Sequence, residues 1–142
     1  MKVLKFGGSS LADAVRYQNV ATIVASIHQT DGAAVVLSAP KGVTNALSLL
    51  TEQAEQGQDL GELQAKLSRT LNSIADELAE AIAGYDITTV KAMIDDTLNY
   101  LDQRLRGIQL LGCAPENTAA ELMSLGEYVS VNLLSHIFKA QG

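Results

Sequence analysis

The apolar positions at the start of the chain follow a strand, helix, strand order. A short run at residues 2–6 predicts a strand that ends at a double glycine. Apolar residues recur at helical spacing over 11–27 and predict one buried face, with Ser9 or Ser10 as the N-cap. The run at 33–37 is continuously apolar, which is typical of a strand buried on both faces of a parallel sheet. The pattern therefore predicts a β-α-β unit with a right-handed connection.

Almost everything after the second strand is helical in pattern. Leucines and isoleucines recur every three or four residues, and they predict helices over 46–56, 59–83, 87–111 and 116–140. The second and third of these carry long heptad-like spacings and are separated by a short turn. They therefore predict an antiparallel helical hairpin.

Two strands make a poor sheet by themselves, because three or more are usual for independent stability. We therefore interpret residues 1–142 as the N-terminal portion of a larger α/β domain. In this interpretation residues 1–45 form the β-α-β start and residues 46–142 form a mainly helical segment. The open edge at 35–37 is expected to seek a partner, which predicts a homo-oligomer.

Composition narrows the possible partners and location. Apolar residues make up 47% of the chain and aromatic residues only 4%, so the core must be aliphatic. The formal net charge of −6 argues against a nucleic-acid partner and against a basic membrane-binding patch. The single cysteine excludes an intrachain disulfide, and too few Cys and His residues are present for a zinc site. No secretory signal or bilayer-length apolar stretch is visible, so a cytoplasmic protein is expected.

The double glycine after the first strand has the features of an anion site. Gly7 and Gly8 let a ligand approach the backbone closely, the following helix presents free N–H groups, and Lys5 adds a positive charge. Ligands of open α/β sheets bind at this end of the strands. The loop is neither a Walker A motif nor a dinucleotide fingerprint. The alternative is a plain strand-to-helix turn.

Two further stretches add polar groups. The loop at 38–45 follows the second strand, so it is expected to open at the same edge as the double glycine; alternatively, Thr44 or Asn45 merely caps the next helix. Gly126 lies inside an apolar helical stretch, which indicates close packing or approach of a ligand. Its neighbour Glu127 is either a buried or cleft-facing carboxylate that needs a cationic partner, or an exposed glutamate on the polar face.

These stretches, in this order, resemble the aspartokinase branch of the amino-acid kinase family. The matching motifs are K-F-G-G-S-S at 5–10, L-S-A-P-K-G-V-T-N at 37–45 and S-L-G-E at 124–127. The resemblance covers the whole chain and is greatest to the bifunctional aspartokinase/homoserine dehydrogenases. It implies the α/β amino-acid kinase (carbamate kinase-like) fold and ATP-dependent phosphorylation of the L-aspartate side chain, the first step of threonine, methionine and lysine biosynthesis.

The resemblance also implies roles for single residues at the nucleotide. Lys5 would contact the ATP phosphates and offset charge on the transferring group. Gly7 and Gly8 would supply backbone contacts, and Ser9 would line the junction between phosphate and substrate. Mg²⁺ would be held mainly through the ATP phosphates, and no metal ligand is assigned to this chain.

At the substrate, the resemblance implies that Ser38, Ala39 and Thr44 hold L-aspartate and that Glu127 pairs with its ammonium group. The rest of the nucleotide site, the regulatory domains and any dehydrogenase domain would lie downstream, so the chain alone is expected to be inactive. Two alternatives stay open: a helical oligomerisation module without catalysis, and a related kinase acting on another carboxylate such as glutamate or an acylated glutamate.

Overall fold

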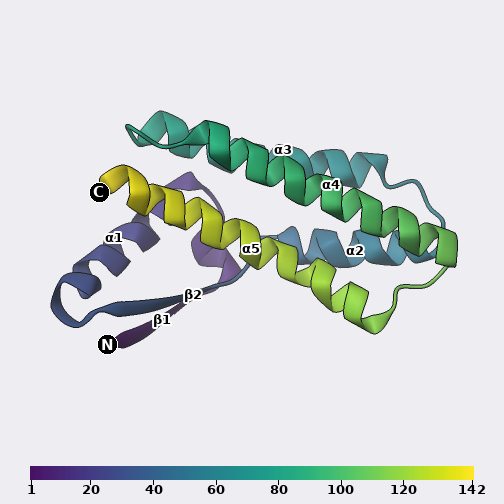
Figure 1. The fold of residues 1–142 in the computed structure, drawn as a ribbon, viewed down its shortest axis with the longest axis horizontal. Helices are drawn as coiled ribbons and strands as arrows, with labels where there is room; N and C mark the ends of the chain where they lie inside the picture. Colours follow the sequence, from purple (N-terminus) through teal and green to yellow (C-terminus); the bar gives the residue numbers. More distant parts are fainter.

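The computed structural model describes residues 1–142 and opens with a β-α-β unit (Figure 1). Strands β1 (Lys2–Phe6) and β2 (Ala33–Leu37) are parallel and pair in register along their whole length. A 3₁₀ turn, η1 (Gly8–Leu11), and helix α1 (Ala14–Asp31) connect them. The predicted strand, helix, strand order is confirmed.

Four helices make up the rest of the chain: α2 (Val43–Glu55), α3 (Gly61–Ala81), α4 (Ile87–Leu111) and α5 (Glu116–Gln141). Helices α3 and α4 lie side by side and run antiparallel, as their heptad-like spacing predicts (Figure 1). The bounds of α4 agree with the prediction, whereas α2 begins three residues earlier and α3 is two residues shorter at each end. No helix combines the length and the apolar character needed to cross a membrane.

The main core lies among α2, α3, α4 and α5. Each helix contributes aliphatic side chains with no solvent exposure, among them Leu50, Leu78, Ile94, Leu105 and Leu133. Such interiors are packed as densely as organic crystals, so the loss of a few methyl groups is costly. These helices therefore form the larger part of one core, which also includes Leu11, Tyr17 and Leu37 of the β-α-β start.

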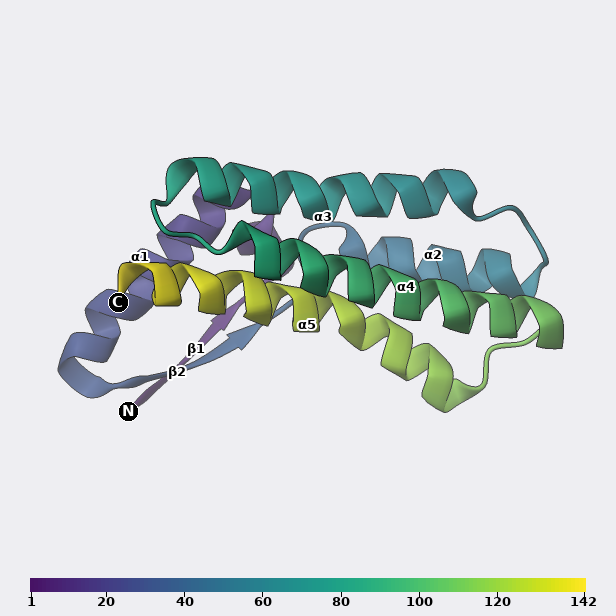
Figure 2. The same cartoon turned by 45° about the horizontal axis from the view of Figure 1, so that its top comes forward.

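The sheet is covered on one face only. Leu4 and Phe6 pack against the core. Helix α1 contacts both strands and α5 contacts β2 (Figure 2). Val3 and Val36 lie on the other face and are 70% and 48% exposed. The prediction of a strand buried on both faces is therefore wrong in this structure. An apolar run makes burial of both faces favourable, but a second layer of elements must pack on the sheet to bury the other face.

The spacing of Leu11, Val15, Ile23, Val24 and Ile27 predicts the buried face of helix α1, and the structure buries only Leu11 and Val24 of this set. Tyr17, Val20 and Val24 are buried, whereas Val15 and Ile23 are 64% and 45% exposed. The helix carries apolar residues on more than one side, so periodicity alone does not select the face that packs.

The N-cap of α1 is Asp13 rather than a serine. The Asp13 carboxylate accepts a hydrogen bond of 2.9 Å from the backbone N–H of Arg16. Ser9 and Ser10 lie one turn earlier, inside η1, where the N–H of Ser10 donates to the carbonyl oxygen of Gly7. The serine-cap prediction is wrong because the chain makes a 3₁₀ turn before the α-helix begins.

Candidate functional site

The loops that follow β1 and β2 leave the sheet at the same edge and touch each other. The N–H of Ser38 donates to the carbonyl oxygen of Phe6 at 3.0 Å, which extends the pairing past the strands. A Cβ atom added at Gly8 would lie 3.2 Å from the carbonyl oxygen of Ala39 and 3.7 Å from the Cα of Lys41. The prediction that both loops open at one edge is confirmed, and the close contact explains a glycine at position 8.

Helix α5 approaches the second loop through Gly126. A Cβ atom at this position would lie 2.4 Å from the Cβ of Ala39 and 3.1 Å from a methyl carbon of Val43. Real Cβ atoms essentially never come as close as the first of these distances. Glycine inside a helix costs about 1 kcal/mol relative to alanine, and here it allows the helix backbone to contact the loop. Of the two interpretations of Gly126, close packing is confirmed.

Glu127 follows Gly126 and is half-buried. Its Oε2 atom is shielded from solvent and has no hydrogen-bond partner. None of the five ion pairs of the protein includes this residue. The alternative of a fully exposed glutamate is therefore wrong. A shielded carboxylate oxygen without a partner is unusual, because buried polar groups are normally hydrogen-bonded.

The residues of the first loop are open to solvent. Lys5 pairs in register with Val36 on the uncovered face of the sheet, is exposed and makes no ion pair. Gly7 has extended backbone angles (φ −81°, ψ 171°), and a Cβ atom there would meet no atom within 4 Å. Ser9 is exposed within η1. Nothing inside the protein therefore requires glycine at position 7.

Thr44 lies in the first turn of α2, which begins without a side-chain cap. The N-cap residue is Gly42, whose left-handed backbone (φ 83°) favours glycine. Thr44 and Asn45 are both exposed, and neither caps the helix. The capping alternative is therefore wrong, and the hydroxyl of Thr44 is free for another partner.

The structure brings together the backbones of the two loops and of α5, but it does not join the predicted side chains directly. No hydrogen bond or ion pair links Lys5 or the Ser9 hydroxyl to Thr44 or Glu127. No group of three or more His, Cys, Asp or Glu side chains could hold a metal ion.

Two supporting interactions were missed by the sequence reasoning. The first is made by Arg16, whose guanidinium donates to the carbonyl oxygen of Ser9 and lies 3.6 Å from the carboxylate of Asp13. This contact holds η1 against the start of α1. The three-residue spacing of Asp13 and Arg16 was a signal available in the sequence.

The second supporting interaction joins α1 to α5. The hydroxyl groups of Tyr17 and Ser130 form a hydrogen bond of 2.8 Å between two residues with no solvent exposure. Burial raises the pKa of the Tyr17 hydroxyl, so it stays neutral. Ser130 lies three residues after Glu127, so the bond fixes this part of α5 relative to the β-α-β unit. No short-range signal predicts it, because the partners are 113 residues apart.

The three motifs resemble those of a known family, and comparison with known proteins tests this resemblance. The profile of the amino acid kinase family matches residues 1–142. The chain belongs to the amino acid kinase family. Within this family it is 31% identical over 141 residues to the bifunctional aspartokinase/homoserine dehydrogenase of Buchnera aphidicola, covering 99% of this chain. It is also 31% identical over 142 residues to the enzyme of the same name from Haemophilus influenzae. The predicted resemblance to aspartokinases is confirmed.

Solved structures of this family share the fold. Escherichia coli aspartokinase III in complex with lysine and aspartate superposes with a TM-score of 0.79, at 27% identity and over 98% of this chain. The same enzyme in complex with aspartate and ADP also gives 0.79, at 26% identity. The predicted α/β amino-acid kinase fold is therefore confirmed. The chain spans 17% of the length of these two curated relatives and 29% of each of these two structural neighbours.

Proposed function

We propose that this chain supplies the phosphate-binding turn and the aspartate-binding loop of an aspartate kinase. The reaction transfers a phosphoryl group from ATP to the side-chain carboxylate of L-aspartate and gives 4-phospho-L-aspartate. The observation that carries the proposal is the meeting of three segments around Ala39. Gly8 and Gly126 both approach this residue, and the neighbour of Gly126 carries a shielded carboxylate oxygen without a partner.

The first loop is suited to the phosphates of ATP. Gly7 has no packing reason to be glycine, so its open backbone is available for close approach of a ligand. Lys5 makes no ion pair that a phosphate would have to displace. We assign backbone contacts with the phosphates to Gly7 and Gly8, a charge contact to Lys5, and the junction with the substrate to Ser9.

The second loop and α5 are suited to L-aspartate. We assign to Ser38, Ala39 and Thr44 the contacts that hold the amino acid, and to Glu127 the pairing with its ammonium group. A cationic ligand would satisfy the Oε2 atom of Glu127, which nothing in the protein satisfies. The complex of E. coli aspartokinase III with aspartate and ADP supports both ligand assignments.

The chemistry requires positioning and charge neutralisation more than covalent help. The carboxylate of aspartate is ionised at neutral pH, so no general base is needed to activate it. ATP supplies the phosphoryl group, and the residues of this chain bind and orient both reactants. Mg²⁺ would be held mainly through the ATP phosphates, where it would offset their negative charge.

We further propose that the chain needs additional sequence for turnover and that the reaction takes place in the cytoplasm. The relatives are about six times as long as this chain. The unpaired edge of β2 at 35–37 and the open sheet face around Val3 and Val36 favour self-association in the isolated chain. This face is also the observation behind the second candidate function, an oligomerisation module without catalysis.

The test is an NMR titration of this chain with L-aspartate, with L-glutamate as the control ligand and Mg-ATP in a third arm. We expect L-aspartate to shift resonances at 38–45 and around Glu127, and L-glutamate to leave them unchanged. The Glu127→Gln variant is expected to weaken aspartate binding at least about tenfold, since it removes the charge that pairs with the ammonium group. Glu116→Gln, an exposed glutamate of the same helix, is the matched control.

Three outcomes would contradict parts of the proposal. Equal binding of L-glutamate would favour a kinase for another carboxylate. Aspartate binding that survives Glu127→Gln would remove the role assigned to that residue. Concentration-dependent self-association with no ligand-induced shift would favour the oligomerisation module.

A further inference from the structure

A cleft of about 290 Å³ lies between α2 and α3, beside the loop that follows β2. One wall is a stripe of α2 and the other is a stripe of α3. On α3 the lining residues Leu63, Lys66, Leu67 and Thr70 follow the spacing of one helix face. None of the residues assigned above to ATP or aspartate lines this cleft.

The charged residues of the cleft are all positive. Lys41 and Lys66 line it, and no acidic residue does. Neither lysine forms an ion pair, although half of the ten basic residues of the protein do. The protein as a whole has 16 acidic residues against 10 basic ones. The cleft therefore carries two unpaired positive charges, although the protein as a whole is negative. This local positive charge favours an anionic ligand.

The remaining lining is largely apolar. Leu49, Leu63 and Leu67 contribute to it, and Leu67 is only 3% exposed. Gly42, the N-cap residue of α2, and Asn45 in its first turn also line the cleft, so the N-terminus of the helix and a side-chain amide lie at the same cleft as the lysines. The cleft thus combines a basic part with an apolar part.

We propose that the α2–α3 cleft binds a small organic anion, namely a carboxylate with a short aliphatic body. The carboxylate lies between Lys41 and Lys66, and the aliphatic body lies against Leu63 and Leu67. The volume is at the lower end of the range for ligand pockets, which suits a ligand the size of an amino acid side chain. This site goes beyond the proposed kinase function, because none of the residues assigned to ATP or L-aspartate lines it.

The test uses the whole chain and four probes in an NMR titration. Pentanoate carries both the charge and the aliphatic body, acetate carries the charge, pentan-1-ol carries the body, and pentylammonium reverses the charge. We expect pentanoate to bind with a dissociation constant on the order of 1 mM and to shift residues of both walls. Acetate, pentan-1-ol and pentylammonium are each expected to bind at least about fivefold more weakly.

Matched variants locate the site. Lys66→Gln is expected to weaken pentanoate binding at least about fivefold. Arg69→Gln removes a positive charge from the same helix outside the cleft, and it is expected to change the affinity less than about twofold. Both residues are exposed, so neither variant should prevent folding.

The proposal is overturned by any of three results. The first is no shift at the cleft with pentanoate at a concentration about tenfold above the expected constant. The second is binding of pentan-1-ol or pentylammonium that equals the binding of pentanoate. The third is an equal loss of affinity in the Lys66→Gln and Arg69→Gln variants, which would show a general charge effect.

Discussion

The helical half of the molecule and its β-α-β half differ in how completely they are packed. Helices α2 to α5 enclose side chains such as Leu105 that have no solvent exposure. The sheet leaves Val3 and Val36 on an open face, and Lys5 has no partner there. Regions with few buried contacts open more easily than a closed core. The comparison teaches that packing is complete among the helices and incomplete on the outer face of the sheet, while the loop that follows β2 is held against α5 by the contact of Ala39 with Gly126.

The largest effect is expected from a cavity in the helical half. Leu105→Ala should lower the free energy of unfolding by about 2–5 kcal/mol, because it removes fully buried methyl groups. Val36→Ala, on the open face of the sheet, should lower it by less than about 1 kcal/mol. Urea denaturation followed by circular dichroism measures both. Equal losses would contradict the division between a closed and an open half.

The next effect tests the junction between the two halves. Gly126→Ala should destabilise the protein by about 1–3 kcal/mol, because the added Cβ would overlap that of Ala39. Gly107→Ala, inside α4, is the matched control, since a Cβ there meets no atom within 4 Å. This control should stabilise the protein by up to about 1 kcal/mol through helix propensity. Urea denaturation measures the free energy of unfolding of both variants. Stabilisation by both substitutions would show that the close contact at Ala39 does not require glycine at position 126.

A smaller effect concerns the start of α1. Asp13→Ala removes the carboxylate that accepts from the N–H of Arg16, and it should cost about 1 kcal/mol. Ser9→Ala and Ser10→Ala should each change stability by less than about 0.5 kcal/mol, since neither hydroxyl caps the helix. Thermal melts of the three variants measure this order. A larger loss of stability in either serine variant than in Asp13→Ala would favour the serine N-cap that the sequence predicts.

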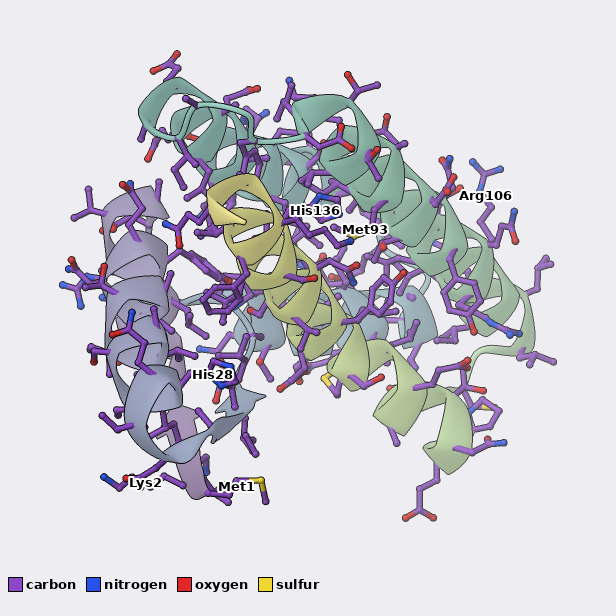
Figure 3. All side chains as sticks on the ribbon, turned by 60° about the vertical axis from the view of Figure 1, so that its left-hand side comes forward. Met1, Lys2, His28, Met93, Arg106 and His136 are labelled. Atoms are coloured by element: carbon purple, nitrogen blue, oxygen red, sulfur yellow. The ribbon has the colours of Figure 1, made fainter.

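The smallest effect is a pH dependence in the hairpin between α3 and α4. Hydrogen bonds from the side chain and backbone N–H of Thr89 hold the pKa of the Asp86 carboxyl below its ordinary value of 3.8, and the charges of His136 and Lys139 act in the same direction. Figure 3 shows His136 on α5, near the hairpin. Because the folded-state pKa is depressed, the stabilisation is fully present above 3.8 and is lost as the pH falls through the folded-state value.

Asp86→Asn keeps an N-cap residue but cannot titrate in this range. Melting temperatures measured down to acidic pH should therefore fall less steeply for the variant than for the parent protein. Parallel curves for the two proteins would show that Asp86 does not contribute to the acid dependence.

Much of the candidate site could be predicted because its signals are local. The loops at the ends of two parallel strands must open at one edge, so the sequence alone places the double glycine and the loop at 38–45 together. The helical pattern placed the end of α4 at its observed position, because Gly112 follows the last residue of the aliphatic repeat and ends the helix. Gly126 was recognisable as a residue with a special role, because glycine is unfavourable inside a helix.

The sequence by itself thus determined the element order, the helical hairpin and the family of this protein. The tertiary structure alone decided which face of α1 is buried, that one face of the sheet stays open, and that Tyr17 meets Ser130. It also decided that Gly126 serves close packing against Ala39 and that an oxygen of Glu127 is shielded without a partner. The physical reason is the range of the interactions: period, caps and turns act between near neighbours, whereas burial depends on which distant elements pack together.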